Sequence, residues 1–227
     1  GKDQWTKLEK IVLPVNFIIT AIAMFVVFYP KDLGAITKDV IITDQDGNTY
    51  SKTTVKSEFR KRYAIYLFEN NTGDTSNDWL SYGMRFSLRQ DFSQDLYLTN
   101  RGNEAHDIKS SMGFGSTERL SVSEMQNISE RVLADYFITG TYDIVDGNYI
   151  INFKIYQTAN AKIISDKTFE NDNLFSLIDE ASLQIKSDIG ISNSYLDNLK
   201  DLPVSEITTG SIDALKSYSL GTLSSEH

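Results

Sequence analysis

The chain has 227 residues, of which 41% are hydrophobic and 23% charged, a composition close to that of an average globular protein. It has 22 basic and 31 acidic residues and a formal net charge of -9, so most of its surface would repel a nucleic acid. The absence of cysteine excludes disulfides and thiolate metal ligands, and two histidines are too few for a histidine-rich metal site.

Residues 11–29 read IVLPVNFIITAIAMFVVFY and include no charged side chain. A helix of this length rises about 28 Å, which matches the hydrocarbon core of a bilayer, so we expect a transmembrane helix. A cleaved signal peptide and a buried globular helix are the alternatives, but the run ends FYPK, without a small-residue cleavage pattern. Lys2, Lys7 and Lys10 precede the run, which favours a cytoplasmic N-terminus and a soluble part outside the cytoplasm. Because the first residue is Gly1 rather than methionine, we expect the sequence to be part of a longer protein.

Two β-prone runs, residues 40–43 and 49–52, flank the turn-forming sequence DQDGN and predict a β-hairpin. The same turn could be read as a calcium loop that begins at Asp44. Such a loop needs a carboxylate at its twelfth position, which is Val55, so the hairpin turn is the preferred interpretation.

Residues 63–68 (YAIYLF) form an apolar run without polar alternation, which is typical of a strand buried on both faces. Apolar residues at spacings of three and four then predict a helix over about 78–95, and residues 96–99 predict a second strand. We expect these three elements to form a β-α-β unit with parallel strands.

Residues 102–116 are polar and carry three glycines, which predicts a loop. Ser121 or Ser123 is expected to cap the next helix, because Glu124 follows Ser121 at the spacing of a capping box. The rest of the pattern predicts three strands, 136–144, 149–157 and 163–169, joined by turns at 146–148 and 158–161, and then an amphipathic helix over 174–189.

The predicted order of elements places the chain in the α/β (α+β) class, as a mixed β-sheet with helices packed on it. The expected organisation is an N-terminal flank and membrane helix (1–30), a hairpin and connector (31–62), the α/β domain (63–190), a linker (191–210) and an amphipathic helix (211–227). Since that last helix has no predicted partner, we expect further helices to follow it.

Three stretches carry a resemblance to a known family. They are YAIYLFENNTGD (63–74) followed by WLSYG, YFITGTY (136–142) followed by GNYII and IYQTAN, and SIDALKSYSLG (211–221). In order and spacing they resemble the TolB amino-terminal-like and FlgO-like domains of bacteria, with the last stretch similar to the helix that opens a tetratricopeptide-repeat array. Such domains often precede these repeats in membrane-bound kinases, nucleotide cyclases and CadC-like transcription regulators.

Glu69 and Asp74 follow the first strand of the predicted sheet, where α/β folds often bind ligands. The preferred alternative is that residues 70–74 only form a turn and cap the next helix. His106 stands near Glu104 and Asp107, a set that could hold a metal weakly, although a solvated loop is the simpler interpretation.

The sequence MGFGS (112–116) lacks the Gly-Lys-Ser/Thr of a phosphate-binding loop, and Arg60-Lys61-Arg62 is the one dense basic cluster in the sequence. We therefore assign no catalytic, cofactor-binding or metal-binding residue and expect no cofactor.

The resemblance implies a non-catalytic protein-interaction or sensory module. The expected location is the bacterial inner membrane, with a periplasmic soluble domain. The expected partners are proteins and, through residues 11–29, the lipid bilayer, with a homo-oligomer or a membrane complex left open and no nucleic acid. The alternatives are the extracytoplasmic regulatory half of a kinase, cyclase or winged-helix regulator, and a small hydrolase whose turnover would depend on Glu69.

Overall fold

The computed structural model describes residues 20, 37–43, 47–199 and 201–225. The chain divides into two compact units, residues 1–58 and 59–227, which are described separately below. Within the described ranges, no helix is both long and apolar enough to cross a bilayer. The membrane helix predicted over 11–29 lies outside these ranges except for Thr20, so it stays a prediction.

The first unit contains an antiparallel pair of strands, β1 (Thr37–Thr43) and β2 (Thr49–Val55). Thr43 lies opposite Thr49, so the two strands meet across a short turn and the expected hairpin is confirmed. Gly47 in this turn has a φ of 84°, which glycine adopts without steric cost. The start of the alternative calcium loop, residues 44–46, lies outside the described residues.

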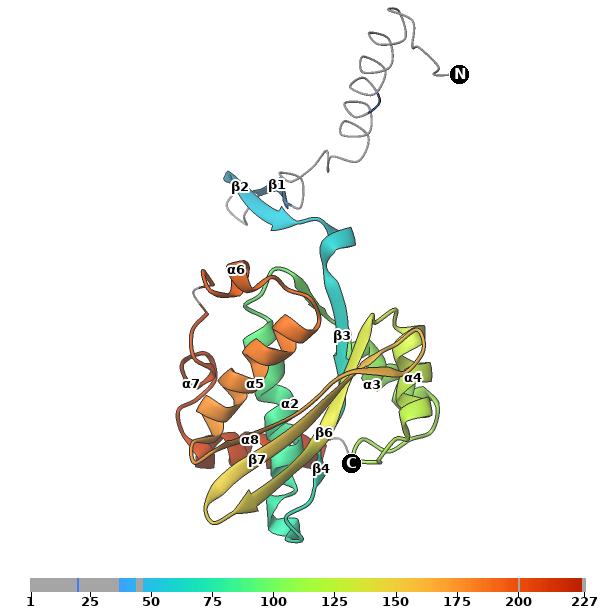
Figure 1. Ribbon diagram of the computed structural model, residues 1–227, viewed down its shortest axis with the longest axis vertical. Coiled ribbons are helices and arrows are strands. Elements are labelled where there is room, and N and C mark those ends of the chain that lie inside the picture. Colours follow the sequence, from blue (N-terminus) through green and yellow to red (C-terminus); the bar gives the residue numbers. More distant parts are fainter. Residues whose placement is uncertain (1–19, 21–36, 44–46, 200, 226–227) are drawn as a thin grey trace, which may run out of the picture. The chain divides into compact units, whose positions relative to one another are not determined.

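The second unit holds a mixed sheet with helices on its two faces (Figure 1). Its elements, preceded by a 3₁₀ helix η1 (Ser57–Phe59), are β3 (Lys61–Ile65), β4 (Glu69–Asn70), η2 (Thr75–Asn77), α2 (Trp79–Phe92), β5 (Leu98–Asn100), α3 (Gly102–Ser111), α4 (Val122–Arg131), β6 (Tyr136–Val145), β7 (Asn148–Gln157), β8 (Lys162–Asn171), α5 (Leu174–Asp188), α6 (Asn193–Leu196), α7 (Val204–Ile207) and α8 (Ile212–Ser225).

The strand order in this sheet is β5-β3-β6-β7-β8, and the short β4 pairs with β6. β3 is parallel to β5 and to β6, which confirms the expected β-α-β unit around α2. β6, β7 and β8 form an antiparallel meander, as expected from their alternation and short turns. Asp146 and Gly147, both with positive φ, make the β6–β7 turn.

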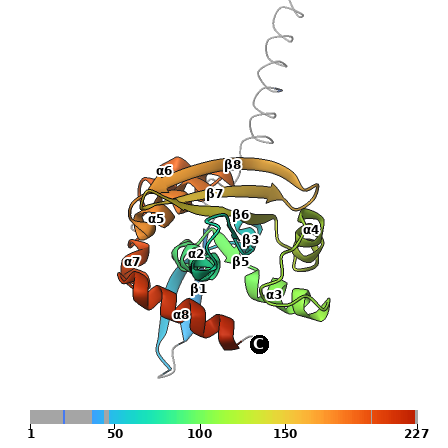
Figure 2. The same cartoon turned by 90° about the horizontal axis from the view of Figure 1, so that it is seen from below.

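Helices α2 and α5 pack on one face of the sheet, and α3 and α4 pack on the other (Figure 2). Alternate residues of β6 enter the two cores: Ile138 and Tyr142 lie with α2 and α5, whereas Phe137 lies with α3 and α4. The ring of Phe137 stacks on that of Tyr156, with centroids 4.7 Å apart. The strands β3, β6 and β7 therefore supply both cores, as the middle of a sheet covered on two faces requires.

The first predicted strand is interrupted. A regular strand over 63–68 would place Phe68 on the same face as Ala64 and Tyr66, because side chains alternate. Instead Ala64 and Tyr66 enter the α3/α4 core and Phe68 enters the α2/α5 core. Residues 66–68 separate β3 from β4. Four residues lead from Ile65 to Glu69 but only three from Ile138 to Thr141 on β6, so this local break resembles a β-bulge in its effect.

The predicted loop over 102–116 was wrong, because its first ten residues form α3. The Asn100 side chain accepts a hydrogen bond from the Gly102 N–H at 2.7 Å, which satisfies one amide at the start of the helix. Ala105 and Lys109 are the only buried residues of α3. The sequence of this helix therefore shows little apolar periodicity. The capping box of Ser121 and Glu124 at the start of α4 is confirmed.

The end of the chain packs on the body of the second unit. Residues 191–210, which we expected to be a linker, hold α6 and α7, and Val204 is fully buried. The predicted C-terminal helix is confirmed as α8, but the expectation that it has nothing to pack on was wrong. Leu215 and Ser219 are buried, and the ring of Tyr218 lies 4.5 Å from that of Phe86 on α2.

Candidate functional site

A cavity of about 760 Å³ opens beyond the C-terminal end of β3. It exists because β5 pairs with β3 only as far as Tyr63 and the chain then turns into α3 at Gly102. Its walls are the sheet residues 65–70 and 139–142, the helices α2, α3 and α8, and the segment 116–122. A volume of this size lies in the range of about 300–1,000 Å³ that small-ligand pockets occupy.

The helical walls bring aromatic and basic side chains together. On α2, the guanidinium of Arg85 lies 4.8 Å from the ring centroid of Tyr82. On α3, the ammonium of Lys109 donates to the carbonyl oxygens of Ser116 at 2.8 Å and Glu118 at 2.9 Å. These two bonds tie the segment before α4 to α3, so Lys109 holds the rim of the cavity in place.

The sheet side of the cavity is polar. Thr139 and Thr141 on β6 and Asn152 and Lys154 on β7 line it. Asn152 donates to an Asp166 carboxylate oxygen on β8 at 2.8 Å, and Lys154 lies 3.7 Å from the same carboxylate. These residues alternate with the buried residues of the α2/α5 core, so the polar face is the one that α3 and α4 leave open.

A smaller cavity of about 350 Å³ adjoins the first and shares Ile65, Tyr82, Arg85, Gly102 and His106 with it. It adds Arg89, whose guanidinium donates to the Asn103 side-chain oxygen at 3.2 Å. Arg85 therefore borders both cavities.

Tyr66 separates the cavity from the α3/α4 core. Its hydroxyl donates to the Met125 carbonyl oxygen at 2.9 Å and contacts the Ser129 hydroxyl at 2.9 Å. Burial raises the pKa of Tyr66 to about 12, although the hydrogen bond to Ser129 lowers it slightly. The phenol stays neutral at physiological pH and is held by two partners, so its arrangement is structural.

The structure places the two acidic residues that the sequence singled out, Glu69 and Asp74, in different surroundings. Glu69 lies on β4, lines the cavity and forms an ion pair with Arg119. Asp74 instead caps η2, where its carboxylate accepts from the Ser76 N–H at 2.8 Å and from the Ser76 hydroxyl at 2.8 Å. The interpretation of Asp74 as a turn and cap residue is confirmed.

His106 lies on α3 and lines the cavity, but its acidic neighbours do not converge on it. Glu104 pairs with Arg101 at 3.0 Å. Across the described part of the chain, no group of three histidine or acidic side chains could hold a metal ion. His106 also forms no hydrogen bond with any described residue.

The basic cluster is also structural. The backbone N–H of Arg62 donates to Asp135 at 2.8 Å, and its guanidinium donates to the same carboxylate at 2.6 and 3.1 Å. Burial alone would raise the pKa of the Asp135 carboxyl, but these hydrogen bonds and the charge of Arg62 outweigh it and lower that pKa. The pair joins the start of β3 to the residue before β6.

Sequence reasoning did not find Arg85, Lys109 and Arg119. Tyr82, Arg85 and Arg89 recur at spacings of three and four on α2, which marks a polar stripe. That stripe becomes informative only when α3 is known to face it, and α3 was predicted to be a loop.

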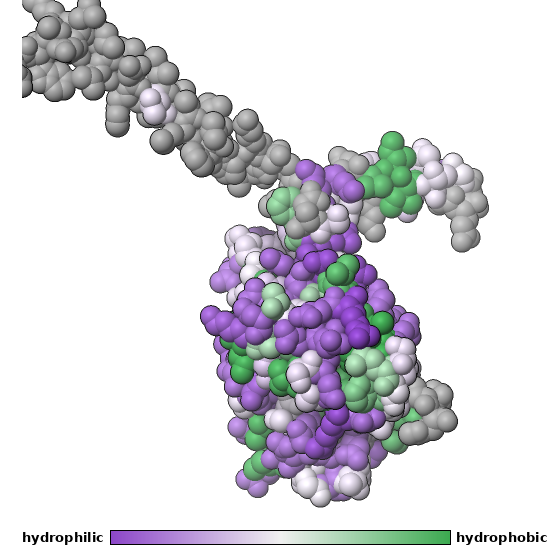
Figure 3. Space-filling view, turned by 90° about the vertical axis from the view of Figure 1, so that its right-hand side faces the viewer, coloured by the Kyte–Doolittle hydropathy of each residue, from purple (hydrophilic) through white to green (hydrophobic). Residues whose placement is uncertain are grey.

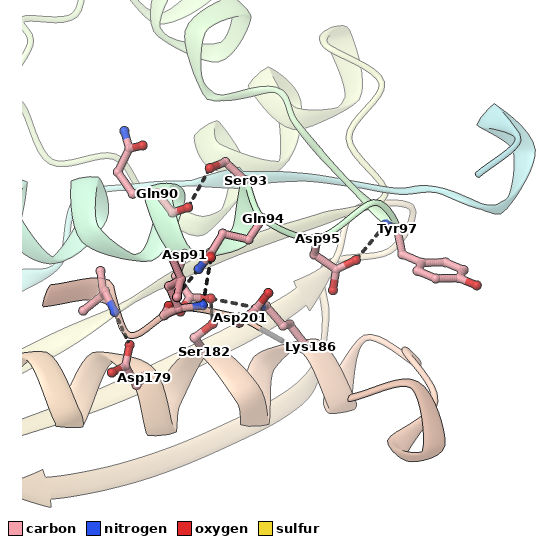
Figure 4. A network of polar contacts seen from close by, with 12 residues as sticks. Gln90, Asp91, Ser93, Gln94, Asp95, Tyr97, Asp179, Ser182, Lys186 and Asp201 are labelled. Carbon is pink, nitrogen blue, oxygen red and sulfur yellow. Dashed lines mark hydrogen bonds and ion pairs between the residues drawn. The ribbon is translucent and has the colours of Figure 1, made fainter. Parts of the chain in front are cut away.

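A second polar cluster lies away from the cavity, between α2, α5 and the segment after α6 (Figure 4). The fully buried ammonium of Lys186 lies 2.8 Å from Asp91 and 2.6 Å from Asp201, and Ser182 donates to Asp91. Burial would lower the pKa of Lys186, but the charge of Asp91 and the bonds to Asp201 and Asp91 outweigh it, so the pKa is raised. The lysine stays charged and joins three segments of the body.

Residues 90–173 match the family model of the FlgO protein. The match runs from the last turn of α2 to the N-cap of α5 and includes α3, α4 and the meander β6–β8. The FlgO part of the resemblance is therefore confirmed for this stretch. The stretches at 63–74 and 211–221 lie outside it, so the TolB-like start and the repeat helix stay predictions.

Several solved structures are distantly similar. The C-terminal domain of LpoB from Escherichia coli has a TM-score of 0.43 and 14% identity, over 49% of this chain and 82% of that domain. TolB from Acinetobacter baumannii has a TM-score of 0.36 and 13% identity, over 67% of this chain and 29% of TolB. Lipoprotein GNA1162 from Neisseria meningitidis has a TM-score of 0.36 and 12% identity, over 58% and 99% of the two chains. No curated protein matches the chain.

Proposed function

We propose that this chain is a non-catalytic protein-interaction module of the bacterial envelope, anchored to the inner membrane by residues 11–29. The observation that carries the proposal is the FlgO match over residues 90–173, since the family resemblance implies a partner-binding role. The matched stretch supplies α3, α4 and four strands of the sheet, and most of the cavity walls come from it.

The chemistry of the cavity supports binding rather than turnover. Three of its polar side chains are held by structural partners: Glu69 by Arg119, Lys109 by two carbonyl oxygens, and Tyr66 by Met125 and Ser129. On the face that Figure 3 shows, hydrophilic residues predominate over the body and hydrophobic residues form only small groups. A partner at the cavity is expected to bind largely through polar contacts, because Thr139, Thr141 and Asn152 line its sheet side.

Site-directed photo-crosslinking in the native host tests the proposal. A photoreactive residue at Thr117 on the cavity rim or at Asp166 on the open sheet face should give a discrete crosslinked band in detergent-extracted membranes. The same label at exposed Leu183, on α5, is the control position. If no position gives a specific crosslink, or if the purified chain turns over ester or phosphate substrates, the proposal is wrong.

A further inference from the structure

Asp95, which follows α2, is a buried carboxylate with too few hydrogen-bond donors. Only 3% of the residue is exposed. One carboxylate oxygen accepts from the Tyr97 N–H at 2.7 Å and lies 3.5 Å from the Tyr195 hydroxyl, which is long for a hydrogen bond. The other oxygen is buried and meets no donor among the described residues. An ionised carboxylate in these surroundings loses its water without full replacement, so its burial is unfavourable.

The chain between α5 and α7 covers this carboxylate with residues 190–199, which we call the α6 segment. The ring of Tyr195 on α6 packs edge-on against that of Tyr97, with centroids 4.7 Å apart. Just after the segment, Asp201 accepts from the ammonium of Lys186 on α5 at 2.6 Å. The segment is therefore fixed at its two ends, and its middle lies against the buried carboxylate.

The charges around Asp95 are mostly negative. Lys186 is the positive group that faces it, and its ammonium already lies 2.8 Å from Asp91 and 2.6 Å from Asp201 (Figure 4). Asp179, also on α5, interacts electrostatically with the same lysine. One ammonium therefore faces four carboxyl groups, and it cannot neutralise all of them.

This environment raises the pKa of the Asp95 carboxyl. Burial is the largest cause and the charge of Asp201 adds to it, whereas the hydrogen bonds to Asp95 and the charge of Lys186 offset it only in part. Burial also raises the pKa of Tyr63 and of Tyr195, so both phenols stay neutral at ordinary pH. The phenols near the carboxyl are Tyr63 on β3, Tyr97 before β5 and Tyr195 on α6.

We propose that Asp95 is a pH-sensitive latch, which holds the α6 segment on the body when its carboxyl is protonated and loosens it when the carboxyl is ionised. Protonation removes a buried negative charge, and lifting the segment lets water reach the ionised group. The pKa is raised only while the segment is docked, so docking is most favourable below the ordinary value of 3.8 and weakens as the pH rises through the docked pKa. The inference does not depend on the proposed function.

Electron paramagnetic resonance of the full chain in non-ionic detergent tests the inference. The chain has no cysteine, so Ser194→Cys, at an exposed serine on α6, takes a single nitroxide label. The mobile fraction of its spectrum should rise about threefold or more between about pH 4 and about pH 8. A label at Ser176→Cys, exposed on α5, should give the same spectrum at both pH values, which shows that the body itself does not loosen.

Asp95→Asn keeps the shape of the side chain without its charge, so the label on α6 should show the low mobile fraction at both pH values. Asp197→Asn is the matched control, because it removes an exposed carboxylate from the same segment and should keep the wild-type pH dependence. Tyr195→Phe removes a donor to the ionised carboxylate, so it should increase the mobile fraction at the higher pH.

A wild-type mobile fraction that is constant or falls as the pH rises would overturn the inference. The same pH dependence in Asp95→Asn as in the wild type would overturn it too. If Asp95→Asn does not fold, Tyr195→Phe decides, and an unchanged mobile fraction at the higher pH then refutes the latch.

Discussion

Gly140 lies on β6, where the backbone of β7 and the ring of Phe68 leave no room for a side chain. A Cβ atom at Gly140 would lie 2.0 Å from the Asn152 carbonyl oxygen and 2.9 Å from the ring of Phe68. We predict that Gly140→Ala lowers the free energy of unfolding by about 3 kcal/mol or more, because backbone must move to admit the methyl group.

Urea denaturation of the two proteins measures this difference. Gly115→Ala is the matched control: its Cβ would meet only the Glu118 side chain at 3.9 Å, so its effect should stay within about 0.5 kcal/mol. Equal losses in the two variants would show that the close approach at Gly140 is not the cause.

The contact of Arg62 with Asp135 makes stability depend on pH. The pKa of Asp135 is lower in the folded chain than its ordinary value of 3.8, so ionisation of this group stabilises the fold above that value. This contribution should be lost as the pH falls through the folded pKa. We predict that Asp135→Asn lowers the Tm at neutral pH and that its difference from wild type shrinks below about pH 4.

Thermal unfolding between about pH 3 and pH 7 measures both proteins. Arg62→Gln removes the same pair from the other side and should reduce the pH dependence in the same way. A Tm difference that is constant over the whole range would contradict the assignment of this pH dependence to the pair.

At the scale of the elements, α8 is a part of the α/β body. Leu215 is fully buried, and Ser219 lies against Gly83, where an added Cβ would be 3.3 Å from the serine oxygen. We predict that Leu215→Ala lowers the free energy of unfolding by about 2–5 kcal/mol, the usual cost of a cavity at a buried leucine. Leu220→Ala, on the same helix but 49% exposed, should cost about 0.5 kcal/mol or less. Urea denaturation that finds equal effects would mean that α8 does not contribute to this core.

Elements with strong periodicity could be predicted from the sequence. The elements α2, α5, β6 and β7 each bury several large side chains. Their apolar residues therefore recur with the helical or strand period along the whole element, and this recurrence is visible in the sequence. α3 buries only Ala105 and Lys109, and its lysine is satisfied by the carbonyls of Ser116 and Glu118. Because such a helix is held by tertiary contacts, its sequence lacks the apolar stripe from which a helix could be predicted.

The candidate site could be predicted only in part for the same reason. Glu69 was found because it follows the first strand, a position that the topology of the sheet determines. Arg85 and His106 reach the site only because α2 and α3 face each other across the end of β5. The break between β3 and β4 also depends on tertiary packing, since the ring of Phe68 enters the other core beside Gly140, where a side chain would collide with it.

At the scale of the whole molecule, ionic contacts join segments that are far apart in the sequence. Lys186 connects α2, α5 and the segment that carries Asp201, and the N–H of Val204 donates to Asp179 on α5 at 2.9 Å. Burial raises the pKa of the Asp179 carboxyl, which that hydrogen bond partly offsets. The residues after α5 are thus fixed to the body before α8 begins, so α8 packs on α2 from a set position.

The proposed membrane anchor, residues 11–29, concerns the whole molecule because it would determine where the chain resides. Since residues 11–29 carry no charge over a bilayer-spanning length, we predict that the full chain stays in the membrane pellet after alkaline carbonate and is released by detergent. An Ile19→Arg, Ala21→Arg double variant should move much of it to the supernatant, because each central arginine costs about 2.5–3.5 kcal/mol of insertion free energy. Leu133→Arg, at an exposed leucine after α4, is the matched control and should stay in the pellet. Immunoblots of the two fractions decide the question, and a wild-type chain found in the carbonate supernatant would mean that residues 11–29 do not anchor it.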